Sequence, residues 1–226
     1  QIRNVLSGRD FVPDGNSVEF LFHFTDGSEF SSKGLNVIDS NQENGKLSFK
    51  FEETQGIAVT MTFWVGDDGN TLRKQISFVQ SSDKTIDYIL LEHIGITNSK
   101  THFTVPTDIK GTELDGFQSS LGQPFYIDTL FFGCEFPATQ NIILYGIGQV
   151  KYFLGKKING EFKCPVTVIG GAESDLMVDV QKSFYEYIED ISTKTDLRLQ
   201  YNSWYDYMKD ITADNIEKSF LSLIHI

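Results

Sequence analysis

Strict alternation of large apolar and smaller or polar residues is the feature that most constrains the fold of this chain. In the segment IAVTMTFWV (57–65), one set of alternate positions holds Ile57, Val59, Met61, Phe63 and Val65. The other set holds Ala58, Thr60, Thr62 and Trp64. A period of two is typical of a half-buried β-strand, because successive side chains point to opposite faces of a sheet. Trp64 is therefore expected on the polar face.

The same pattern recurs along the first three quarters of the chain. Further strands are predicted at VEFLFHF (18–24), LSFKF (47–51), TLRKQISFV (71–79), DYILLEHIGI (87–96), PFYIDTLFFGCEF (124–136), NIILYGIGQV (141–150) and FKCPVTVI (162–169). Asn44-Gly45 and Asn159-Gly160 predict hairpin turns, because these residue types tolerate positive φ angles, and TDGS (25–28) and DDGN (67–70) predict turns too. Many strands without intervening helices predict a mainly β fold, with one large antiparallel β-sandwich over residues 1–172.

The period changes at Ser174, where helical spacing begins. Ser174 or Asp175 is a candidate cap, and one predicted helix face holds Leu176, Val180, Phe184, Tyr187, Ile188 and Ile191. We expect residues 173–196 to form this helix and a polar linker. Residues 197–226 predict a strand, a polar loop and a last helix, which Asp210 or Thr212 can cap. Strand, loop and helix make the first unit of an α/β structure, here the start of an incomplete barrel.

Composition and charge exclude several function classes. The chain has 19 basic and 31 acidic residues, a formal charge of −12 and a pI near 4.7, so nucleic acids and anionic membrane surfaces would repel it. No segment approaches the roughly 20 apolar residues of a membrane span, and the first residues lack the apolar core of a signal peptide. The compartment stays open: bacterial cytoplasm, or secretion and the cell surface if a signal lies upstream.

Neither cysteines nor histidines point to a metal or redox site. Unpaired buried thiols are favoured for Cys134 and Cys164 over a single disulfide. The histidines are His23, His93, His102 and His225. They lack the spacing of metal ligands on a shared helix. We therefore expect no metal and no cofactor.

Two segments carry a resemblance to a known family. LRLQYNSWYDYMKDITADNI (197–216) is similar to the start of the catalytic barrel of glycoside hydrolase family 36, the α-galactosidases and α-N-acetylgalactosaminidases, where a barrel strand ends in an Asn-Ser-Trp or Asn-Asn-Trp motif. GQPFYIDTLFFGCEFPATQN (122–141) resembles part of the β-sandwich, of supersandwich type, that precedes this barrel in bacterial members, some of which carry an inherited enterotoxin label. The helix at 174–191 matches the family's connection between the two.

The resemblance implies a function and a set of site residues. It makes the chain the non-catalytic N-terminal domain of a retaining glycosidase that acts on terminal α-linked galactose or N-acetylgalactosamine, with the choice of sugar left open. The two catalytic aspartates of the family lie on later barrel strands, so no catalytic residue is expected in this chain. Substrate-binding candidates are Asn202, Trp204 and Asp206, which fall at the C-terminal end of the first barrel strand.

Each of these assignments has a plainer alternative. Trp204, which the resemblance places against the sugar, is also compatible with ordinary core packing at the end of a strand. Asp206 can orient a hydroxyl group or bond a loop amide. The whole chain can also be a free-standing β-sandwich that binds glycans or a protein partner. The tail has apolar residues that need cover, so it is expected either to pack back onto the sandwich or to associate with the same segment of another chain in a homo-oligomer. These residues are Leu199, Tyr201, Ile216, Phe220 and Leu223.

Overall fold

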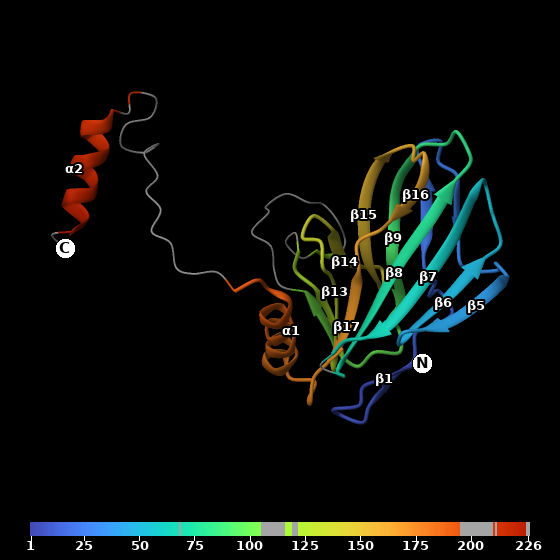
Figure 1. The fold of residues 1–226 in the computed structure, drawn as a ribbon. Coiled ribbons are helices and arrows are strands. Elements are labelled where there is room, and N and C mark those ends of the chain that lie inside the picture. Colours follow the sequence, from blue (N-terminus) through green and yellow to red (C-terminus); the bar gives the residue numbers. More distant parts are fainter. Residues whose placement is uncertain (68, 105–115, 119–121, 195–209, 211, 225–226) are drawn as a thin grey trace. The chain divides into compact units, whose positions relative to one another are not determined.

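The computed structural model describes residues 1–67, 69–104, 116–118, 122–194, 210 and 212–224. It divides into two compact units, Gln1–Asp190 and Ile191–Ile226. The first unit is built almost entirely of antiparallel strands and carries one helix (Figure 1). The predicted mainly β fold, with sheets that are antiparallel throughout the described pairings, is thereby confirmed.

The larger sheet has nine strands. Its hydrogen-bonded order is β10 (His102–Thr104), β12 (Phe125–Ile127), β13 (Leu130–Cys134), β17 (Thr167–Gly171), β8 (Thr71–Gln80), β7 (Ile57–Val65), β6 (Lys46–Phe51) and β5 (Val37–Glu43), and β16 (Gly160–Lys163) also pairs with β8. The smaller sheet has six strands in the order β11 (Gly116–Gln118), β14 (Gln140–Leu144), β15 (Ile147–Lys156), β9 (Ile86–Gly95), β3 (Leu21–Phe24) and β4 (Glu29–Ser31). A two-stranded hairpin joins β1 (Ile2–Arg3) to β2 (Asp10–Phe11).

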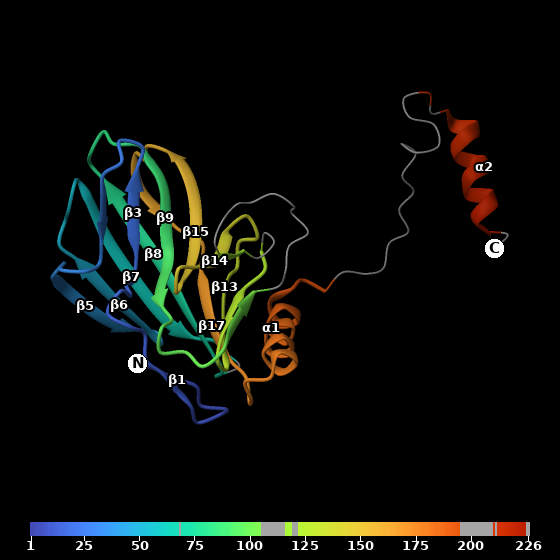
Figure 2. The ribbon, with the colours of Figure 1, turned by 180° about the vertical axis from the view of Figure 1, so that it is seen from behind.

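The main core lies between the two sheets. Strands β5 to β8 are nearest the viewer in Figure 1, and β3, β9 and β15 in Figure 2. Phenylalanine rings fill much of the space between the sheets: the ring of Phe22 meets that of Phe78 edge to face at 5.1 Å between centroids, and Phe125 stacks on Phe132 at the same distance. Aromatic pairs in these geometries contribute roughly 0.5–1.5 kcal/mol each beyond the area they bury.

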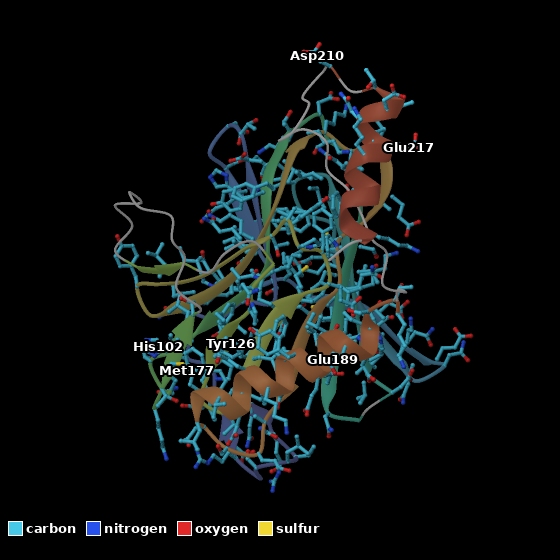
Figure 3. All side chains as sticks on the ribbon, turned by 90° about the vertical axis from the view of Figure 1, so that its left-hand side faces the viewer. His102, Tyr126, Met177, Glu189, Asp210 and Glu217 are labelled. Carbon is cyan, nitrogen blue, oxygen red and sulfur yellow. The ribbon has the colours of Figure 1, made fainter. Side chains whose placement is uncertain are left out.

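A second, smaller core lies on the outer face of the nine-stranded sheet, beneath α1 (Met177–Ile191). Its buried members are Tyr126, Phe131, Val168, Ala172, Val180, Phe184 and Tyr187. Figure 3 looks onto this helix, with Met177 at its first residue, Glu189 toward its end and Tyr126 beside its N-terminal half. The predicted apolar face is thus correct in its middle and wrong at its ends, because Leu176 and Ile191 are 61% and 40% exposed.

The start of α1 differs in detail from the prediction. The helix begins at Met177, and Ser174 Oγ accepts a hydrogen bond from the Leu176 N–H and donates one to Asp179 in the first turn. Asp175 instead forms an ion pair of 2.5 Å with Arg9 of the N-terminal hairpin. The hydroxyl therefore supports the turn that leads into the helix, and the carboxylate connects it to the N-terminal segment.

Two predicted strands are wrong in length, because each is two strands joined by a turn. The segment 124–136 turns at Asp128, whose φ is 51°, and 141–150 turns at Tyr145-Gly146, whose φ values are 49° and 76°. The predicted strand 162–169 runs along β8 but is interrupted after Lys163 by a one-residue register shift, which separates β16 from β17. Asn44-Gly45 forms the expected hairpin turn, with φ values of 51° and 74°. Asn159-Gly160 does not, since it connects β15 in one sheet to β16 in the other.

The second unit contains α2 (Ala213–Ile224). Thr212 Oγ1 accepts a hydrogen bond from the Asn215 N–H at 3.2 Å, which makes Thr212 the N-cap, as predicted. The backbone carbonyl of Asp210 accepts a bond from the Asn215 side chain at 3.4 Å. The predicted domain boundaries at 172/173 and 196/197, and a barrel strand at 197–209, stay predictions. Among the described residues, no helix has the length and apolar character to cross a membrane.

Candidate functional site

The sugar-binding residues expected from the sequence, Asn202, Trp204 and Asp206, lie outside the described residues. The candidate site that the described part of the chain offers is a pocket of about 450 Å³ at one end of the sandwich, between the two sheets. Its apolar walls are formed by Ile2, Val18, Phe63, Leu72, Ile94 and Ile169. Its polar groups come from Asp14, Ser17, Glu19, Ser32, Lys74, Glu92 and His93.

A β-bulge in β9 brings a carboxylate into this end of the sandwich. Leu90 pairs with Lys151 of β15 and Glu92 pairs with Val150, so Leu91 is an extra residue in the ladder. Both Leu91 and Glu92 are consequently buried, with exposed fractions of 1% and 3%. Without the extra residue, strict alternation would place only one of the two inside the sandwich.

Glu92 forms an ion pair with Lys74 across the gap between the sheets. Nζ of Lys74 lies 2.8 Å from Oε2 of Glu92 and also donates to the backbone carbonyl of Glu19 at 2.9 Å. The Thr167 hydroxyl donates to the other oxygen, Oε1, at 2.5 Å. Both charged side chains are about 95% buried. The pair therefore connects β8 and β17 of the larger sheet to β9 of the smaller one.

Burial and charge act against each other on Glu92. Removal from water raises the pKa of the Glu92 carboxyl, and the Lys74 ammonium and the Thr167 hydroxyl act in the opposite direction. For Glu92, burial prevails and its pKa is raised overall. His93 lines the same pocket. Burial lowers the pKa of His93 and therefore favours its neutral form. The pocket therefore holds a neutral imidazole at neutral pH beside the 2.8 Å contact between Lys74 and Glu92.

The rim of the pocket is fixed by a close approach between the loop at Asp14 and β9. Asp14 accepts hydrogen bonds from the Thr97 hydroxyl at 2.6 Å and from the Asn16 N–H at 2.8 Å, and these bonds lower the pKa of its carboxyl. A Cβ atom at Gly95 would lie 1.8 Å from Asp14 Oδ1. A side chain at position 95 would therefore displace the Asp14 carboxylate from its present position.

This arrangement favours binding over acid or base chemistry. Each oxygen of Glu92 already accepts a hydrogen bond, and Lys74 is committed to Glu92 and Glu19. The carboxylate of Glu19 lies 3.5 Å from Lys74 Nζ, and its side chain is 56% exposed, so it can also face a ligand at the mouth of the pocket. A pocket of several hundred Å³ with apolar walls and a few polar groups has the size and character of a small-molecule site.

Sequence reasoning missed both charged residues, although one of them left a signal. Lys74 shares the inward face of its strand with Ile76 and Phe78, which are each 1% exposed. A lysine on the same strand face as buried residues is expected to be buried too, which indicates a buried partner for its charge. Glu92 left no comparable signal, because its position depends on the bulge.

Other candidates from the sequence are also placed by the structure. Trp64 lies half-buried on the outer face of β7, with the Lys46 ammonium 4.6 Å above its ring. Cys134 and Cys164 are unpaired, as favoured from the sequence, and burial raises the pKa of Cys134 to about 11. Within the described residues, no group of three or more histidine, cysteine, aspartate or glutamate side chains is arranged to hold a metal ion.

Comparison with solved structures identifies an enzyme that contains a similar architecture. The chain aligns with the crystal structure of the GH36 alpha-galactosidase AgaA from Geobacillus stearothermophilus, a variant in complex with 1-deoxygalactonojirimycin, with a TM-score of 0.52. The sequences are 11% identical, and the alignment covers 88% of this chain and 37% of that enzyme. The domain has a distant glycoside hydrolase family 36-like fold. No family model and no curated protein matches the sequence.

The family 36-like likeness is one of fold. The segment 122–141 forms β12, β13 and the start of β14 in this structure. The chain spans 37% of the length of AgaA, so most of that enzyme has no counterpart in the residues discussed.

Proposed function

We propose that this chain is the non-catalytic N-terminal domain of a carbohydrate-active enzyme, a retaining α-galactosidase or α-N-acetylgalactosaminidase that acts on terminal α-linked sugars. The single observation that carries the proposal is the likeness of the described fold to a family 36 α-galactosidase over 88% of the chain. The motif at 197–216 supports it, because the same segment resembles the first strand of the family's barrel.

The proposal assigns no catalytic residue to this chain. Retaining hydrolysis needs two carboxylates about 5 Å apart, one as nucleophile and one as general acid and base. In the pocket of the described sandwich, the two oxygens of Glu92 are engaged by Lys74 and Thr167. The catalytic aspartates would come from barrel strands that follow residue 226. Asn202, Trp204 and Asp206 would contribute to the sugar pocket from the first strand.

Hydrolysis of nitrophenyl glycosides tests the proposal. We expect the 226-residue chain to release no nitrophenol from an α-galactoside or an α-N-acetylgalactosaminide, and a chain extended through the downstream coding sequence to release it. In the extended chain, Trp204→Ala is expected to reduce turnover and leave the melting temperature nearly unchanged. Activity of the 226-residue chain that a substitution within it abolishes would overturn the proposal, as would an extended chain that hydrolyses neither substrate.

A second candidate function is glycan binding by the sandwich itself, as a free-standing module. The observation that favours it is the pocket between the sheets, where the Phe63 ring lies among serine, histidine and carboxylate side chains. An aromatic or aliphatic wall suits the C–H face of a hexose, and the polar groups suit its hydroxyls.

Titration with galactose and N-acetylgalactosamine, followed by amide NMR shifts, tests this alternative. Binding at the pocket predicts shifts around Ser17, Phe63 and His93, and their loss in Phe63→Ala. Phe136→Ala is the matched control, since Phe136 is 42% exposed and does not line this pocket. Absence of amide shifts at high sugar concentration would rule out this alternative and leave the first proposal as the remaining one.

A further inference from the structure

The free edge of β5 is the strongest unassigned feature of the described surface. β5 is the last strand of the nine-stranded sheet, and its described strand partner is β6 alone. Figure 1 shows it at the margin of the sheet, on the side away from α1. One row of its backbone N–H and C=O groups therefore faces outward, where it can form a ladder with another strand.

The side chains of β5 do little to protect this edge. All seven residues are exposed, including Val37 at 50% and Ile38 at 58%. Edge strands of soluble proteins are commonly protected by charged side chains, especially lysine, by proline or by bulges. β5 contains neither lysine nor proline, its charged residues are Asp39 and Glu43, and its bulge is confined to Ile38, so that 39–43 pairs residue by residue with 46–50. The regular part of the strand is thus open.

Charge and the length of the ladder together select one way for this edge to pair with itself. A two-fold axis through Asp39 would oppose two aspartates, and an axis through Asn41 would oppose Asp39 to Glu43. An axis through Ser40 opposes Asp39 to Asn41 and Ile38 to Gln42, with no like charges facing each other. With the axis through Ser40, most residues of β5 also pair with a residue of the second copy.

We propose that β5 is an interface for a second copy of this chain, which pairs antiparallel to it with Ser40 opposite Ser40. The two nine-stranded sheets then form one continuous sheet across the axis. The contact is isologous, because the same residues serve on both sides. A single pair of short strands makes a small interface, so the association is weak and depends on protein concentration.

The net charge of the chain predicts how salt affects this contact. Each copy carries a formal charge of −12, so two copies repel each other at long range. Salt screens this repulsion and leaves the backbone hydrogen bonds of the ladder in place. Dimerisation through β5 is therefore expected to strengthen as ionic strength rises, whereas an interface held by ion pairs would weaken.

Cysteine cross-linking tests the register. Ser40→Cys places two thiols directly opposite each other, within the range of Cα separations that a disulfide spans. Gln42→Cys is the matched control on the same strand, because its two copies would be four residues apart along the ladder, about 14 Å. Mild oxidation of the full chain is expected to give a disulfide dimer with Ser40→Cys and no more than the wild-type background with Gln42→Cys. Equal yields from the two variants would overturn the register.

Sedimentation equilibrium tests the interface itself. Ile38→Lys adds a protecting lysine to the edge and is expected to weaken dimerisation of the full chain by about tenfold. Val79→Lys serves as control, because Val79 is 49% exposed on β8, in the interior of the same sheet. Dimers that are equally strong in Ile38→Lys, or that weaken as salt is added, would place the contact elsewhere, for example at the tail.

Discussion

The hydroxyl group of Tyr187 donates a 2.7 Å hydrogen bond to Oε1 of Glu135, and this contact fastens α1 to the outer face of the larger sheet. Arg73 Nε donates to the same oxygen at 2.9 Å, and its guanidinium lies 5.4 Å from the centre of the Tyr187 ring. Burial raises the pKa of Tyr187, and the Glu135 carboxylate raises it further, so the hydroxyl remains a donor over the whole neutral range.

Tyr187→Phe is expected to lower the free energy of unfolding by about 1–2 kcal/mol, because it removes a hydrogen bond to a charged acceptor and retains the ring. Urea unfolding of the full chain gives the measurement. Tyr185→Phe on the exposed side of the same helix is the control and should change little, since Tyr185 is 52% exposed. Equal effects of the two substitutions would mean that the Glu135 contact does not stabilise the helix.

The neighbouring Tyr126 should respond with the opposite sign. Its ring stacks on Phe103 at 4.4 Å, it is fully buried beneath α1, and its hydroxyl has no hydrogen-bond partner among the described residues. A buried polar group without a partner costs about 1–3 kcal/mol. Tyr126→Phe is therefore expected to raise the urea midpoint of unfolding. A lower midpoint would show that the hydroxyl has a partner in solution, such as a bound water.

The ion pair between Lys74 and Glu92 should show strong non-additivity. Glu92→Gln alone removes the buried counter-charge of the Lys74 ammonium and leaves it only the half-exposed carboxylate of Glu19 at 3.5 Å, so it is expected to destabilise the fold by about 3 kcal/mol. Lys74→Met leaves an unpaired carboxylate with a similar effect. The double variant Lys74→Met with Glu92→Gln should recover most of the loss, because no buried charge remains. A double-mutant cycle in urea provides the measurement, and simple addition of the two losses would refute electrostatic coupling.

Stability at acidic pH should depend in part on Asp26. The hydroxyl and N–H of Ser28 donate to its carboxylate at 2.5 and 2.8 Å and, together with Lys84, lower its pKa from 3.8 to about 2. Because the pKa is lower in the folded state, the charged Asp26 carboxylate stabilises the fold fully above pH 3.8. This contribution is lost as the pH falls through about 2. The stability difference between wild type and Asp26→Asn should therefore shrink over that range. Carboxyl NMR titration reads the pKa directly, and Ser28→Ala should raise it.

Much of the fold was predictable from periodicity, and the exceptions have local causes. The segment 57–65 forms a strand with the predicted bounds, and its burial follows the predicted alternation except at Val65, which is 59% exposed at the strand end. Two turns were interpreted as strand: tyrosine is an unusual residue at positive φ before Gly146, and Asp128 has no neighbouring glycine. β5 was not predicted because VIDSNQE is too polar to show an apolar face. It forms through its ladder with β6, which is a non-local effect.

The candidate site was less accessible to sequence reasoning. Lys74 could have been flagged by its phase with Ile76 and Phe78, but its partner could not, because pairing between the sheets depends on how they stack. Glu92 lies in a run of apolar residues where alternation alone assigns it to the opposite face from Leu91. Asn202, Trp204 and Asp206, which lie outside the described residues, stay predictions.

The extra residue in β9 also bears on how this protein can change in length during evolution. Deletion of Leu91 would remove the bulge and leave Glu92 opposite Val150, with every later side chain on its present face. Deletion of Ile89 or Ile94, in regular parts of the strand, would shift the following residues by one and exchange inward for outward side chains. Relatives with a shorter β9 are therefore expected to have lost the residue at 91 or 92, and the loss of 92 would free Lys74 to become neutral or to be replaced.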